Sequence, residues 1–334
     1  HQGYRAQWSD TDVLPLANES WLDSLVDTEA AAPLLKGRLQ ADSQVLVLPG
    51  FYGRNADGDI QLLGRNGTDS SAAAFAAALG AGLCQIWKDV AGFFTADPRI
   101  VRNARCLEEV SYDEAMELTY FGAKVISAKA LTPLAANGIP CEVRTTYDPS
   151  KPGTLVHGAA KRADVVRGIS HLHDVSSITL QGGGLRGRVG IARRVMDALA
   201  SESISILLIV QSSSEYSITL CVRQVDERKA RRALDEEFHF ERLHGLIEEI
   251  GVQSDRAVVS LVGEGMKHYR GIAARFLTAI SSAGVNVEVI AQGSTECAIA
   301  VVVRGEDAQP ATRACHTAFF SHSTHIDLVL LGCG

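Results

Sequence analysis

The sequence of 334 residues has no apolar run that approaches the roughly 18 to 20 uncharged residues needed to cross a bilayer. Its first ten residues have neither the basic segment nor the apolar segment that opens a secretory signal peptide. These absences exclude a membrane-spanning class and favour a cytoplasmic location. Disorder is excluded by composition, because 46% of the residues are hydrophobic and only 21% are charged. The length favours two or three domains.

An excess of basic charge is also missing, since 32 Lys and Arg face 39 Asp and Glu, for a net charge of −7. This balance argues against a nucleic-acid or anionic-membrane surface. Cysteines are few and scattered, with no C-x-x-C pair, so we expect buried free thiols and neither disulfides nor zinc ligands. They are Cys84, Cys106, Cys141, Cys221, Cys297, Cys315 and Cys333. The chain also lacks an initial methionine and ends on an apolar run, so we expect it to be part of a longer protein.

A repeat at a fixed offset of 81 residues is the most informative feature that is present. Ten identities recur without a gap, which chance does not produce in so short a window. The first copy holds Gly182, Gly184, Gly190, Ile191, Ala192, Arg194, Gln211, Ser213, Glu215 and Ile218, and the second holds Gly263, Gly265, Gly271, Ile272, Ala273, Arg275, Gln292, Ser294, Glu296 and Ile299.

Each copy predicts a strand, a Gly-x-Gly turn, an amphipathic helix and two further strands. The expected ranges are 177–180, 189–200, 204–210 and 216–222 in the first copy, and 258–262, 270–282, 285–291 and 297–303 in the second. A helix then follows each copy, at 227–237 and 308–319, and a last strand is expected at 326–331. The repeat therefore predicts two small α+β modules side by side.

The first part of the chain alternates strands and helices, which predicts an α/β layer with a parallel sheet. Strands are expected at 44–49, 83–87 and 139–144, and helices at 69–79, from Ser111, and at 127–137. Ser111 and Glu114 have the spacing of a capping box. Two prolines and a glycine in 148–153, followed by a basic stretch at 161–167, place the end of this layer near residue 155.

Three loops of this layer hold residues suited to chemistry. In the first, LGRNGTDSS at 63–71, glycines allow close backbone approach and the following helix offers free N–H groups to an anion. Arg65 is suited to a carboxylate and Asp69 to an ammonium. The same loop also fits a plain turn in which Thr68 or Asp69 caps the helix. Both interpretations stay open on this loop alone.

The second loop, WKDVAGFFTADPR at 87–99, follows an apolar strand. Ligands of open α/β sheets bind beyond the carboxyl ends of the strands, so Asp89, Gly92 and Arg99 are placed to meet a nucleotide. A turn packed by its aromatic residues is the alternative. The third segment, FGAK at 121–124, ends the capped helix, and Lys124 is either a phosphate ligand or an ordinary solvated lysine.

Taken together, these loops resemble the aspartate kinase family. The resemblance rests on LGRNGTD at 63–69, IWKDVAGFFTADPR at 86–99, LEEVSYDEAME at 107–117, YFGAKV at 120–125 and PGTL at 152–155. The remainder resembles the paired ACT regulatory modules of bifunctional aspartokinase–homoserine dehydrogenases, through QSSSEYSI at 211–218 and AQGSTE at 291–296. The resemblance runs from about residue 44 to the end, while residues 1–43 carry no motif that can be placed.

The resemblance implies the carboxyl-terminal part of an amino-acid-kinase parallel-sheet fold over 1–155. Two ACT modules of the ferredoxin-like βαββαβ type would follow over 156–331. It also implies phosphoryl transfer from ATP to the side-chain carboxylate of L-aspartate, in the biosynthesis of threonine, methionine and lysine. By motif, Arg65 would grip an aspartate carboxylate beside Thr68, and Asp69 would face the substrate ammonium.

For the nucleotide, the resemblance implies Asp89 toward the ribose, Phe94 beside the adenine, and Gly92 in the loop. Arg99 and Lys124 would face the phosphates, which carry Mg²⁺ without a metal site built from protein ligands. Six features depart from the family pattern. The Lys-Phe-Gly-Gly strand and a second acidic, hydroxyl-bearing substrate segment are both absent. Lys88 replaces the usual threonine, Ala91 the usual aspartate, Phe94 the common tyrosine, and ISAKA at 126–130 the usual Leu-His-Pro-Arg-Thr. We therefore expect the chain to be inactive as a kinase on its own.

For the regulatory half, the resemblance implies an effector amino acid, with threonine expected, at Gln211 and Gln292. A glutamine at the end of a strand can also simply face solvent, although the recurrence at one repeat position favours binding. Assembly is expected to be a homodimer or larger, through the ACT modules. The alternative to an enzyme is a non-catalytic, amino-acid-binding regulatory fragment.

The tail, DLVLLGCG at 327–334, has two compatible interpretations. Its strand is expected to complete the first ACT module, with the second module, about 252–305, inserted within the first. Its Gly-x-Gly at 332–334 resembles the truncated start of the dinucleotide-binding dehydrogenase domain.

Overall fold

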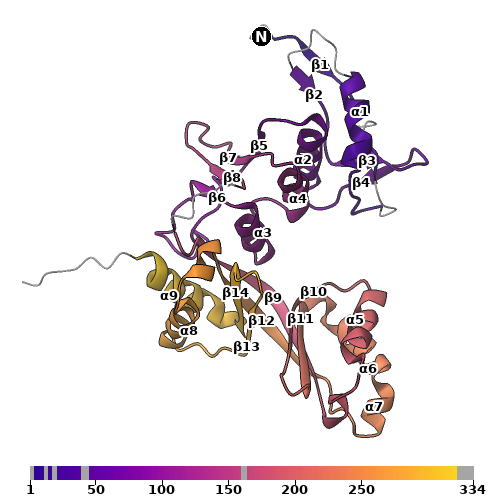
Figure 1. Ribbon diagram of the computed structural model, residues 1–334, viewed down its shortest axis with the longest axis vertical. Coiled ribbons are helices and arrows are strands. Elements are labelled where there is room, and N and C mark those ends of the chain that lie inside the picture. Colours follow the sequence, from indigo (N-terminus) through magenta and orange to yellow (C-terminus); the bar gives the residue numbers. More distant parts are fainter. Residues whose placement is uncertain (1–3, 11–13, 17–20, 39–44, 159–163, 322–334) are drawn as a thin grey trace, which may run out of the picture.

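The computed structural model describes residues 4–10, 14–16, 21–38, 45–158 and 164–321 of the chain. An amino-terminal α/β unit stands above two α+β modules (Figure 1). Its elements are β1 (Ala6–Trp8), α1 (Thr28–Arg38), β2 (Val45–Val47), β3 (Tyr52–Arg54), β4 (Ile60–Leu62), α2 (Gly67–Leu79), β5 (Cys84–Lys88), β6 (Glu109–Val110), α3 (Tyr112–Tyr120), α4 (Ala128–Ala136), β7 (Cys141–Thr145) and β8 (Thr154–Val156).

The main sheet of the amino-terminal unit has the strand order β5-β7-β8-β6. The parallel pairing expected from the sequence is found for β5 with β7 and for β6 with β8, but β7 and β8 run antiparallel. The sheet is therefore mixed. Its core includes the fully buried Phe93, Leu131 and Val143, which pack with the apolar faces of α3 and α4.

The residues before β3 add a small layer to this unit. β1 and β2 form a parallel pair, and β3 and β4 form an antiparallel pair. Helix α1 packs on α2, where Leu14 and Leu35 are fully buried against Ala74 and Ala78. The expected strand 44–49 is shorter in the structure, as β2.

The two modules share one six-stranded sheet with the order β10-β11-β9-β12-β14-β13. The elements of the first copy are β9 (Gly168–Gln181), η2 (Gly183–Leu185), α5 (Ile191–Ser201), β10 (Ile206–Gln211), β11 (Ser217–Arg223), η3 (Gln224–Asp226), α6 (Glu227–Glu237) and α7 (His239–Leu243). Those of the second copy are β12 (Gly251–Val262), η4 (Glu264–His268), α8 (Ile272–Ser282), β13 (Val289–Gln292), β14 (Ala298–Arg304), η5 (Gly305–Asp307) and α9 (Ala308–Phe320). The predicted elements are thus found in both copies, while the expected strand 326–331 lies outside the described residues.

Strands β9 and β12 run antiparallel along almost their whole length, and each belongs to both modules. The start of β12 pairs with the end of β9 through Gly251↔Thr179, and completes the first module. The start of β9 pairs with the end of β12 through Gly168↔Val262, and completes the second. The expected nesting is therefore reversed: the first module lies within the second, because β9 begins nine residues earlier than its apolar pattern indicates.

A matched pair of backbone irregularities marks the crossover between modules. Asp174 in β9 and Asp255 in β12 stand 81 residues apart, and both have left-handed backbones, with φ of 58° and 55°. The β9–β12 register shifts on either side of Arg256. Aspartate tolerates this conformation better than most residues. The repeat therefore extends to the bend that lets one long strand serve two modules.

The six described cysteines are all free thiols. Cys106 is partly buried and the other five are buried, as expected, while Cys333 lies outside the described residues. In the part of the chain that the structure describes, no helix is both long and apolar enough to cross a membrane.

Candidate functional site

The first candidate loop joins β4 to α2. Helix α2 begins at Gly67, and its N-cap residue Asn66 has a left-handed backbone and makes no capping bond with its side chain. The alternative interpretation, in which Thr68 or Asp69 caps the helix, is therefore wrong, because both residues already lie inside the first turn. Arg65 and Thr68 are exposed at this helix start. An uncapped helix start beside an exposed arginine is suited to an anion.

Asp69 behaves differently from its two neighbours because it is buried, with 6% of its surface exposed. One of its carboxylate oxygens, Oδ2, accepts a hydrogen bond from Lys88 Nζ at 2.6 Å. Lys88 is the last residue of β5, so this ion pair joins the 63–71 loop to the start of the 87–99 loop. The two loops expected to hold acceptor and nucleotide are thus brought together by their own side chains.

Strand β8 fixes the second loop through the side chain of its first residue, Thr154. The Thr154 hydroxyl donates to the carbonyl of Leu107 at 2.7 Å and accepts from Phe93 N–H at 2.9 Å. Gly92 is buried with a φ of 142°, and a Cβ there would lie 2.2 Å from the Thr154 oxygen. Gly92 therefore allows the close approach of loop and strand, which is a structural role for this candidate residue.

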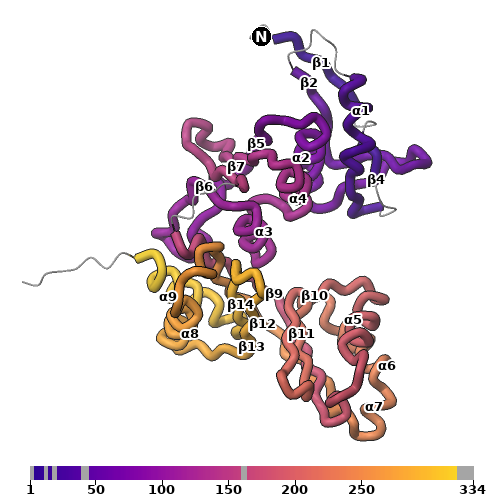
Figure 2. The backbone as a smooth tube through the Cα atoms, in the orientation of Figure 1, coloured from indigo at the N-terminus to yellow at the C-terminus, as the bar shows by residue number. Residues whose placement is uncertain are grey.

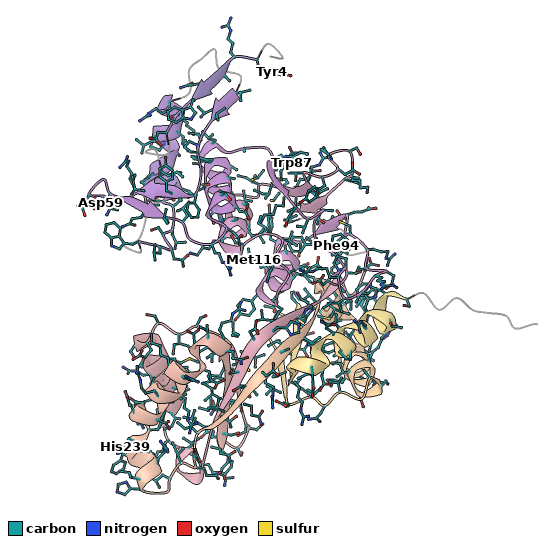
Figure 3. The ribbon with its side chains drawn as sticks, turned by 180° about the vertical axis from the view of Figure 1, so that it is seen from behind. Tyr4, Asp59, Trp87, Phe94, Met116 and His239 are labelled. Atoms are coloured by element: carbon teal, nitrogen blue, oxygen red, sulfur yellow. The ribbon has the colours of Figure 1, made fainter. Side chains whose placement is uncertain are left out.

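The remaining residues of the second loop spread along it. Asp89 is exposed directly after β5. Phe94 is half-buried, and its backbone pairs with that of Cys106 in an isolated antiparallel β-bridge. Figure 3 labels Trp87 near the start of the loop and Phe94 further along, closer to the modules. Arg99 forms an exposed ion pair with Asp97 at 2.7 Å. Burial acts to raise the pKa of Asp97, but hydrogen bonds and charge from Arg99 lower it overall.

The third segment follows α3. The capping box is confirmed: the Ser111 hydroxyl accepts from Glu114 N–H, and the Glu114 carboxylate accepts from Ser111 N–H, both at 3.1 Å. Lys124 is exposed beyond the helix. Within the described ranges, no hydrogen bond or ion pair links Arg99 or Lys124 to the 63–71 loop.

Contacts that the sequence did not predict join the amino-terminal unit to the modules. The Arg167 guanidinium binds the Glu114 carboxylate at 3.2 Å, with side chains only 6% and 4% exposed, and Glu264 N–H also donates to Glu114. On the other side of the junction, Thr95 Oγ1 lies 2.9 Å from Nε2 of His316 in α9. Figure 2 shows the yellow helix α9 beside the lower end of the amino-terminal unit. Such contacts join residues up to 221 positions apart, so no local sequence signal reveals them.

Gln211 and Gln292 end β10 and β13, as the repeat predicted, and both are exposed. Gln292 lines a cavity of about 510 Å³ between α3 and the modules, with Glu117 and Tyr120 on its opposite wall. The Tyr120 hydroxyl donates to Leu207 carbonyl at 2.7 Å. Gln292 therefore lines a cavity to which α3 of the amino-terminal unit also contributes. Among the described residues, no cluster of three or more histidine, cysteine or carboxylate side chains is arranged to hold a metal ion.

Comparison with known families matches both parts of the chain. Residues 7–145 match the amino acid kinase family, so the likeness starts earlier than the motifs indicated. Residues 178–238 and 259–319 each match the ACT domain, again at an offset of 81. The resemblance and the fold class inferred from the motifs are confirmed.

Individual relatives agree. The chain is 42% identical over its full length to the bifunctional aspartokinase/homoserine dehydrogenase of Haemophilus influenzae, covering 41% of that protein. It thus spans about two-fifths of the length of the bifunctional relatives it matches. It is 35% identical to the aspartokinase of Mycobacterium bovis, over 85% of this chain and 68% of that protein.

A solved structure extends the likeness to the fold. Escherichia coli aspartokinase III in complex with aspartate and ADP matches with a TM-score of 0.81 and 28% identity, over 95% of this chain and 70% of that one. The kinase-like unit, the paired ACT modules and these relatives together show that the chain belongs to the aspartokinase family.

Proposed function

We propose that the chain carries part of an aspartate kinase site, at which a phosphoryl group passes from ATP to the side-chain carboxylate of L-aspartate, under feedback by threonine. The observation that carries the proposal is the junction of the 63–71 and 87–99 loops through Asp69 and Lys88. An exposed arginine at an uncapped helix start lies on one side of this junction, and a loop beyond the carboxyl end of β5 lies on the other. A neighbouring fold, aspartokinase III of Escherichia coli, carries aspartate and ADP.

In this reaction a carboxylate oxygen attacks the terminal phosphorus of ATP, and the bond from that phosphorus to the bridging oxygen breaks. The electron pair stays on ADP, and no proton needs to move because the acceptor is already ionised. Catalysis is therefore mostly positioning and neutralisation of charge. Arg65 would orient the acceptor, Asp89 and Phe94 would hold the nucleoside, and Arg99 and Lys124 would meet the phosphates. Mg²⁺ would be carried by the phosphates.

Calorimetric titration with ADP and magnesium, and then with L-aspartate, tests this assignment. Arg65→Ala is expected to weaken aspartate binding at least tenfold and spare ADP, because a charged hydrogen bond to a carboxylate is worth about 1.5 to 3 kcal/mol. Lys124→Ala is expected to weaken ADP binding and to spare aspartate binding. Arg102→Ala, an exposed arginine outside the candidate loops, is the matched control. Failure of the chain to bind either ligand would sink the proposal.

Threonine feedback is supported by the exposed glutamines at equivalent strand ends, and by the contact of the Gln292 cavity with α3. Helix α3 leads directly into the segment that carries Lys124, so an effector there can shift the kinase site if it binds two arrangements unequally. Titration with threonine, lysine and methionine tests it. Gln211→Ala and Gln292→Ala should weaken threonine binding, whereas Gln224→Ala, an exposed glutamine elsewhere, should not. If none of the three amino acids binds, the proposal of threonine feedback is contradicted.

A further inference from the structure

The ion pair between Lys88 and Asp69 is the feature that the proposed function does not yet use. The Lys88 side chain is 17% exposed and the Asp69 side chain 8%. Asp69 therefore already holds an internal ammonium in the place where the resemblance expects the ammonium of the substrate. Lys88 itself occupies a position at which the resemblance leads one to expect threonine.

The backbone at Lys88 is fixed as firmly as its side chain. Its carbonyl accepts from the N–H of Thr146 at 2.8 Å and from the Thr146 hydroxyl at 3.1 Å. Thr146 directly follows β7, which runs parallel to β5, with Lys88 opposite Thr145. The ammonium therefore projects from a rigid sheet edge, the edge where ligands of α/β folds bind.

A desolvated ion pair is a costly way to stabilise a fold, because burying both charges offsets most of their attraction. If the pair had only a packing role, a threonine at position 88 and a neutral residue at position 69 would fill it without burying charge. The pair instead joins the two loops proposed to hold the carboxylate of the acceptor and the phosphates of the nucleotide. A fixed cation at such a place neutralises charge without needing to reorganise.

We propose that Lys88 is a phosphate-binding residue of the kinase site, and that Asp69 is the positioning residue that aims it, in place of binding the substrate ammonium. This inference rests on the proposed kinase function and assigns within it a residue that the family pattern lacks. The ammonium contacts the terminal phosphate of the bound nucleotide. In the transfer step the bond from the terminal phosphorus to the bridging oxygen breaks as the bond to the acceptor oxygen forms, and Lys88 transfers no proton.

Titration of the chain with adenylyl imidodiphosphate and with AMP, both in magnesium, tests the proposal by comparing three phosphates with one. Lys88→Met is expected to weaken binding of the triphosphate analogue about tenfold or more and to leave AMP unchanged. Lys88→Arg is expected to retain part of the affinity. Thermal unfolding of each variant is measured alongside, because Lys88→Met alone leaves the Asp69 carboxylate buried without its partner.

The double variant Lys88→Met, Asp69→Asn separates a structural pair from a functional one. It removes both charges, so stability is expected to recover while affinity for the triphosphate analogue stays low. Recovery of that affinity in the double variant would show a purely structural pair and overturn the proposal. So would equal losses for AMP and the analogue, or a Lys88→Met variant that binds aspartate more tightly with unchanged nucleotide affinity. If the unaltered chain does not bind the analogue, the proposed function fails and this inference with it.

Discussion

Thr95 and His316 lie 2.9 Å apart across the junction of the kinase-like unit and the second ACT module, and each is only 2% exposed. The first belongs to the loop expected to hold the nucleotide, and the second to the last described helix. Their contact means that the loop is braced by the regulatory half of the chain.

Stability is expected to fall as the pH drops below about 6.5, the ordinary pKa of histidine. Burial, with a smaller contribution from Arg105, lowers the pKa of His316 in the folded chain. The unfolded chain then binds the proton more readily, so acid favours unfolding, and the stability contributed by the neutral ring is present above that pH. Urea unfolding between pH 5 and 8 measures the slope. His316→Gln should flatten it, and an unchanged slope in that variant would assign it to other groups.

Loss of the Glu114 carboxylate is expected to be among the most damaging single changes at the junction. Glu114→Ala removes a carboxylate partner of the buried Arg167 and the acceptor for two backbone N–H groups. Breaking a buried ion pair by removing one partner costs about 3 to 5 kcal/mol. Urea unfolding measures the difference. Asp113→Ala, in the same helix turn but exposed, is the control and should cost about 1 kcal/mol or less.

Substitutions at two glycines with positive φ allow the cost of backbone strain to be measured apart from the cost of steric crowding. A Cβ at Gly122 would lie 2.1 Å from the His171 carbonyl oxygen, whereas a Cβ at Gly138 would meet nothing within 4 Å. Gly138→Ala should cost only the strain of the left-handed backbone, about 1 to 2 kcal/mol. Gly122→Ala must also push the kinase-like unit away from β9, and should cost clearly more in the same unfolding assay. Equal losses of unfolding free energy in the two variants would mean that the contact of Gly122 with β9 adds no steric cost.

Assembly through the ACT modules, which we also propose, is expected to depend on the edge strands β10 and β13. Ile209 and Ile290 occupy equivalent repeat positions there and are 38% and 50% exposed. Covering apolar side chains is the usual source of association energy. Sedimentation should show that Ile209→Glu or Ile290→Glu shifts a dimer toward monomer, while Val225→Glu, 88% exposed in η3, does not. A monomeric unaltered chain would end this proposal.

The sequence predicted the modules well because their identities recur at one offset and their helices have a clear apolar face. It misplaced the nesting because the first half of β9 includes Ser170, His171 and His173 among its apolar residues. That half gives no clean alternation, although pairing with the end of β12 makes it a strand. The three-residue strands β1 and β2 are likewise too short to show a period.

The candidate site was predicted as three separate segments but not as one unit. Arg65, Asp89 and Lys124 were found from local motifs, and their binding roles remain predictions. The Lys88–Asp69 pair joins residues 19 positions apart through the packing of α2 on β5, and Gly92 is shaped by Thr154, 62 positions away. Such relations depend on the tertiary fold, which local patterns do not contain.

Because β9 and β12 each supply a strand to both ACT modules, neither module can be removed whole, by a protease or by a gene deletion, without tearing the other. The two would melt as a single cooperative unit. A displacement at one end of β9 or β12 is expected to reach the other module, because the strand backbone is continuous through both modules. Asp174 and Asp255 lie where each strand passes from one module to the other, and the kinase-like unit contacts the half of β9 that belongs to the second module.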